Sequence, residues 1–75
     1  MTVKEAERAF EEMLPCEFKG YSALYKSRYE RPIEIRYKKG GSMLTSVYLV
    51  FEDERVGRRC TCEIPIEKLR LVEGE

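Results

Sequence analysis

The chain has 75 residues, of which 43% are hydrophobic and 37% are charged, and its formal net charge is zero. This length predicts one domain, 1–75, with a small core, and the composition excludes a disordered chain. No apolar run approaches the ~20 residues that a membrane-spanning helix needs, which excludes an integral membrane protein of that type.

The first predicted element is an amphipathic helix over residues 2–14. Thr2 and Glu5 have the spacing of a capping box, and apolar residues recur with helical periodicity at Val3, Ala6, Phe10, Met13 and Leu14. Pro15 is expected to end the helix. The first ten residues include acidic residues and have no apolar core like that of an export signal, so we expect a cytoplasmic protein.

Residues 17–72 form the predicted β-rich part of the domain. Its first segment is ambiguous, because Tyr21, Ala23 and Tyr25 alternate as in a strand while residues 21–28 also fit one face of a helix. The tyrosines favour a strand. The segment is therefore expected to start the β-rich part.

A hairpin follows in the middle of the chain. Ile33, Ile35 and Tyr37 alternate with charged residues, which predicts a half-buried strand, and "KKGGS" predicts a tight turn. The next segment, 45–53, is predicted to be the central strand, with one core-facing set made of Val47, Leu49 and Phe51.

The last elements come after a predicted turn at "ERVG". Alternation from residue 59 directs four side chains toward the core, namely Cys60, Cys62, Ile64 and Ile66. Pro65 should end this strand, "PIEK" should form one helical turn, and "LRLV" should form a last short strand before a frayed tail, 73–75.

These elements predict an α+β fold in which the N-terminal amphipathic helix packs on a small antiparallel sheet of four to five strands or on a partly open barrel. Three short motifs, "ALY" at Ala23–Tyr25, "KKG" at Lys38–Gly40 and "IP" at Ile64–Pro65, follow one another in an order that resembles the Src-homology-three (SH3) barrel. The likeness spans residues 23–72. It implies an SH3-like fold and a protein-binding role, but not a polyproline site, because the chain has no tryptophan.

The sequence predicts no catalytic, cofactor-binding or metal-ligating residues. Without histidine, acid-base catalysis would depend on groups whose pKa a chain this short has little interior to shift. Cys60 and Cys62 have the wrong spacing for a zinc knuckle, and Cys16 is the only other thiol. Three cysteines fit reduced thiols better than a disulfide framework.

The charge is unevenly distributed along the chain. Residues 1–18 carry −3, residues 19–42 carry +5 and residues 43–75 carry −2, counting Lys and Arg against Asp and Glu. The basic segment 19–42 also contains tyrosines, and this combination suits binding of a partner. The predicted partner-binding residues are Tyr21, Tyr25, Lys26, Arg28, Tyr29, Arg31, Arg36 and Lys38.

Two classes of partner are compatible with this segment. The first is a larger protein on which the chain docks as an adaptor, subunit or inhibitor, since Tyr and Arg are enriched where interfaces concentrate their energy. The alternative is single-stranded nucleic acid, with cations on phosphates and tyrosines stacked on bases. Edge strands of the β-rich part also offer a route to a homodimer.

Overall fold

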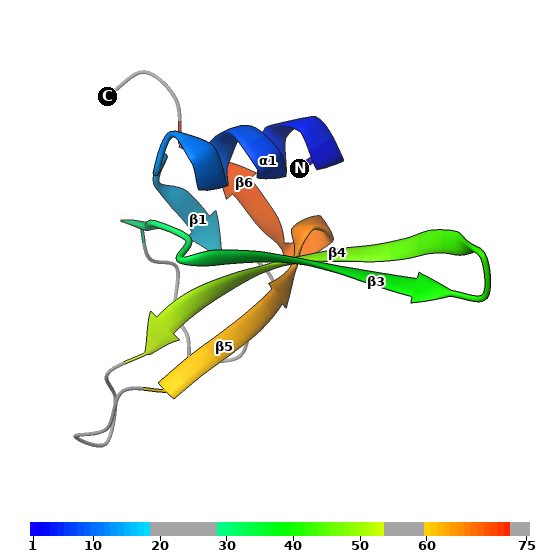
Figure 1. The fold of residues 1–75 in the computed structure, drawn as a ribbon. Helices are drawn as coiled ribbons and strands as arrows, with labels where there is room; N and C mark the ends of the chain where they lie inside the picture. Colours follow the sequence, from blue (N-terminus) through cyan, green and yellow to red (C-terminus); the bar gives the residue numbers. More distant parts are fainter. Residues whose placement is uncertain (19–28, 54–59, 73–75) are drawn as a thin grey trace.

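The computed structural model of the chain describes residues 1–18, 29–53 and 60–72 (Figure 1). These residues form one helix, α1 (Val3–Glu11), one 3-10 turn, η2 (Ile66–Lys68), and strands. The strands are β1 (Cys16–Phe18), β2 (Tyr29–Glu30), β3 (Glu34–Gly40), β4 (Met43–Asp53), β5 (Cys60–Pro65) and β6 (Leu69–Leu71).

The strands form two antiparallel sheets, one in the order β2-β1-β6 and the other in the order β3-β4-β5. The predicted α+β class, with an N-terminal helix on antiparallel strands, is confirmed. The described strands divide into two three-stranded sheets, and not into one sheet of four to five strands. These strands do not close into a barrel.

Helix α1 starts where the capping box predicted. The Thr2 backbone N–H donates to the Glu5 carboxylate at 2.9 Å, and the Glu5 N–H donates to the Thr2 hydroxyl at 3.2 Å. The helix ends before the predicted residue 14, because Met13 takes a left-handed conformation with φ 54°. Its buried side chains are Ala6 and Ala9, whereas Val3 and Met13, which were predicted to face the core, are exposed.

The core lies between α1 and the two sheets. Phe18 from β1 meets Phe51 from β4 in an edge-on contact, with ring centroids 4.6 Å apart. The buried residues around this pair come from both sheets and the helix, and they include Ala6, Ala9, Cys16, Val47, Leu49, Ile64, Leu69 and Leu71. The apolar residues of each sheet therefore cover those of the other.

Strand β4 is the central strand of its sheet, as predicted, with Val47, Leu49 and Phe51 buried on the face toward α1. The predicted turn also forms, and Gly41 has the positive φ, 65°, that favours glycine. From the edge of the core, at the Tyr37–Val47 pair, the β3–β4 hairpin continues as a projection past α1 (Figure 1). We call residues 37–47 of this hairpin the arm.

Three side chains that the alternation predicted to face the core are exposed, so these predictions are wrong. Cys60 is exposed because it pairs with Asp53 at the end of β5, beyond Cys62, which is itself only half-buried opposite the buried Phe51. Ile33 precedes β3 and is 42% exposed, and Tyr37 lies on the arm and is 44% exposed. Side chains alternate between the two faces of the strands as predicted, but the buried core does not extend to the ends of the strands.

Candidate functional site

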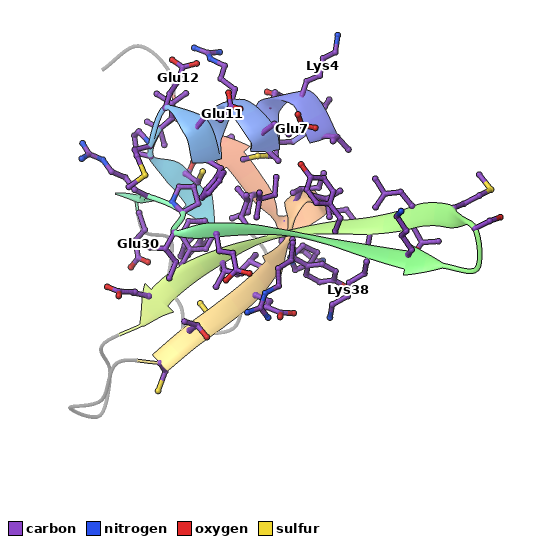
Figure 2. All side chains as sticks on the ribbon, viewed as in Figure 1. Lys4, Glu7, Glu11, Glu12, Glu30 and Lys38 are labelled. Atoms are coloured by element: carbon purple, nitrogen blue, oxygen red, sulfur yellow. The ribbon has the colours of Figure 1, made fainter. Side chains whose placement is uncertain are left out.

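The structure describes only part of the predicted partner-binding set. Tyr21, Tyr25, Lys26 and Arg28 lie outside the described residues, and so does the side chain of Tyr29. Arg31 is exposed just after β2, while Arg36 and Lys38 are exposed on β3. Figure 2 shows Lys38 on the side of the arm turned away from α1.

Arg36 and Lys38 belong to an ion-pair cluster on this outer side. Arg36 Nε lies 2.8 Å from Glu34 Oε1, and the Arg36 guanidinium also contacts the Glu63 carboxylate of β5. Lys38 Nζ lies 3.1 Å from Glu63 Oε2 and 4.6 Å from the centre of the Tyr48 ring. Both cations therefore already have anionic partners within the chain.

This cluster also shifts the pKa of Glu63 and the pKa of Arg36. Hydrogen bonds from Lys38, which has the larger effect, and from Arg36 lower the pKa of the Glu63 carboxyl. Hydrogen bonds to Glu34 and Glu63 raise the pKa of the Arg36 guanidinium. The Glu63 carboxylate and the Arg36 guanidinium therefore favour each other's charged forms, which is a structural role for a residue predicted to contact phosphate.

The opposite side of the arm carries apolar side chains. A groove of about 200 Å³ lies between the arm, the start of α1 and η2. It is lined by Met1, Val3, Leu44, Thr45, Ser46, Val47, Ile66 and Glu67. Leu44 keeps 44% of its surface exposed there, and Met43 at the tip of the hairpin keeps 71%.

The floor of this groove is held by the main chain. The Met1 amino group donates to the Ile66 carbonyl at 2.8 Å and to the Leu69 carbonyl at 3.0 Å, which fixes Met1 against η2. On the arm, Lys39 pairs with Leu44 across the hairpin, after an irregularity between Lys38 and Lys39. Directly paired residues project on the same side of a sheet, so Lys39 stands beside Leu44.

We call the surface made by Met1, Val3, Lys39, Leu44, Val47, Ile66 and Glu67 the arm face. Sequence reasoning included Lys39 only as part of the basic segment 19–42, and it selected none of the other residues as a binding site. The available signal was Met43-Leu44, two large apolar residues placed directly after a turn, where strand alternation and turn composition both favour polar side chains.

Sulfur and carboxylate groups do not form a metal site in the described part of the chain. Cys16, Cys60 and Cys62 are not joined by disulfide bonds. Cys16 is fully buried, and this burial raises the pKa of its thiol to about 11, so its reactive thiolate is scarce at neutral pH.

Comparison with protein-family models, with curated proteins and with solved structures finds no match. Within the described ranges, no helix is long and apolar enough to cross a membrane. The function is therefore inferred from the surface of the molecule itself.

Proposed function

We propose that the chain is a non-catalytic binding domain that docks on a larger protein through the arm face. The supporting observation is the exposed apolar surface around the groove, where Leu44 and Val3 meet solvent although apolar core is scarce in a chain of this size. Exposed apolar patches with a polar rim are typical of protein interaction sites.

The chemistry of the groove defines the kind of partner. A groove of about 200 Å³ fits one aliphatic anchor side chain of a partner protein, and the flanking Lys39 and Glu67 favour a partner with charges of both signs beside that anchor. A central apolar anchor with a charged rim is the arrangement in which interfaces concentrate binding energy.

A nucleic-acid partner has less support. Arg36 and Lys38, the two described β3 cations of the predicted set, are bound by Glu34 and Glu63, so they have little free charge to offer to phosphates. The formal net charge of zero provides no compensating field. A protein partner, in contrast to nucleic acid, also explains why apolar side chains are exposed on the arm face.

We also propose that the two sheets are a partly open relative of the SH3 barrel and that the chain acts in the cytoplasm. The 3-10 turn η2, between β5 and the last strand β6, supports the first proposal because the SH3 barrel has a one-turn helix before its last strand. Three cysteines that form no disulfide support the second, since thiols persist in a reducing compartment.

The test compares three proteins as bait in an extract of the cells that produce the chain: the wild type, Leu44→Glu and Ile33→Glu. Ile33 is a matched control, because it is an apolar residue of similar exposure, 42%, outside the arm face. We expect a protein that the wild type and I33E retain and L44E loses, followed by the same order of affinities with that protein purified. A protein retained equally by all three would contradict the proposal.

The alternative is tested in parallel by titrating single-stranded and duplex nucleic acid at two salt concentrations. Micromolar affinity that falls steeply with salt would favour nucleic acid over a protein partner. We expect no such binding, and L44E should leave the titration unchanged.

A further inference from the structure

The arm face carries opposite charges at its two ends. Lys39 lies near the tip of the arm beside Leu44, whereas Glu67 lies at the base of the groove beside Ile66. Neither forms an ion pair with another residue of the described ranges. Leu44 and the buried Val47 both line the groove, and β4 extends over about 10 Å between them, the length of three strand residues.

Such a surface is complementary to itself. In a two-fold symmetric dimer the arm face of one copy lies antiparallel to the arm face of the other copy. The tip of each arm then faces the base of the groove of the other copy. Leu44 of each copy then reaches the groove of the other, and two Lys39–Glu67 pairs form across the interface. A net charge of zero adds no repulsion between the copies.

We propose that the arm face of the free chain is covered by the arm face of a second copy, which the larger protein partner replaces on binding. This inference rests on the proposed function, because both use the arm face as a protein-docking surface. It also differs from pairing through an edge strand. The β3 edge carries Arg36, Lys38 and Lys39, and cations of this kind discourage strand addition.

Sedimentation-velocity ultracentrifugation over a wide range of concentrations tests the dimer. The wild type is expected to show a monomer–dimer equilibrium, and I33E is expected to match it. L44E removes both anchor side chains of the symmetric interface, so its dimer dissociation constant should rise about a hundredfold. Circular dichroism and thermal unfolding establish that L44E is folded, as expected for a side chain that is 44% exposed.

Charge reversal tests the two-fold geometry itself. K39E alone or E67K alone places like charges together twice in each homodimer, so each dissociation constant should rise about tenfold. An equimolar mixture of K39E and E67K restores opposite charges at both contacts, and its heterodimer should regain the wild-type affinity. The double variant K39E/E67K should regain it as a homodimer.

A wild type that remains monomeric at all concentrations overturns the dimer, and so does a dimer that L44E leaves intact. If the mixture of K39E and E67K has the same dimer dissociation constant as each variant alone, the two-fold arrangement with Lys39 opposite Glu67 is overturned. If the wild type is monomeric but captures a protein partner that L44E does not retain, the proposed function still stands. Capture that L44E does not change overturns the proposed function, whatever the oligomeric state.

Discussion

The Phe18 ring of β1 contacts the Phe51 ring of β4 edge-on, with an angle of 69° between the ring planes, and this pair joins the two sheets across the core. Phe51 is fully buried, and Phe18 is nearly so. Aromatic pairs in this geometry add to the free energy of burial. The contact therefore fixes how the sheet that bears the arm sits on the rest of the molecule.

Phe51→Ala should destabilise the fold by about 3–5 kcal/mol, because it leaves a cavity in the centre of the core and removes the ring contact. Small domains have a free energy of unfolding of only about 5–15 kcal/mol, so much of the variant should be unfolded at 37 °C. Urea denaturation followed by circular dichroism measures the change. Thr61→Ala, at an exposed β5 position, is the control, and equal midpoints for the two variants would contradict this account of the core.

Thr2→Ala should lower the free energy of unfolding by about 1 kcal/mol, because the Glu5 N–H loses the hydroxyl that accepts its hydrogen bond. Thr2→Ser keeps a hydroxyl at the cap and should remain close to the wild type. Urea midpoints of the three proteins test this ordering. A serine variant as unstable as the alanine variant would show that the hydroxyl is not the stabilising group.

Glu63→Gln should make the fold less sensitive to acid. The pKa of Glu63 is lower in the folded than in the unfolded chain, so the stabilisation is present above the ordinary carboxyl pKa of about 4.3 and is lost as the pH falls through the lower folded value. The difference in melting temperature between the wild type and E63Q should therefore be largest near pH 7 and shrink toward pH 3. A difference that stays constant over this range would contradict the role of the cluster, and Glu67→Gln is the control.

Cys16 should resist thiol reagents in the folded protein. Its pKa of about 11, raised from 9.0, lowers the thiolate fraction about a hundredfold, and burial blocks access as well. Cys60 is exposed and should react first with a disulfide reagent at pH 8. Peptide mass spectrometry of timed samples gives the order, and labelling of Cys16 as fast as Cys60 without denaturant would contradict the buried position.

Much of the fold was predictable because local signals agree with tertiary packing. The capping box at Thr2, the alternation through Leu49, the turn at Gly41 and the single helical turn after Pro65 all act over a few residues, and the structure contains each of them. Local hydrogen bonds and side-chain periodicity determine these elements.

The partner-binding surface was not predictable in the same way. Alternation states which side chains share a face of a strand, but not how far the helix covers that face, so Tyr37 and Cys60 were expected inside the core and lie outside it. Met1, Leu44 and Ile66 are far apart in sequence and meet only through the packing of α1, β4 and η2. The sequence also does not show that Arg36 has an anionic partner, because Glu63 of β5 lies far from it in the chain and close to it only in the fold.

Site-specific photocrosslinking at the arm face tests the central claim most directly. A photoreactive amino acid replaces Leu44 in one protein and Ile33 in a control, and both are irradiated in cells that produce the chain. The account predicts covalent adducts with protein at position 44, either a larger partner or a second copy, and few at position 33. Equal yields at the two positions, or adducts with nucleic acid alone, would contradict docking through the arm face.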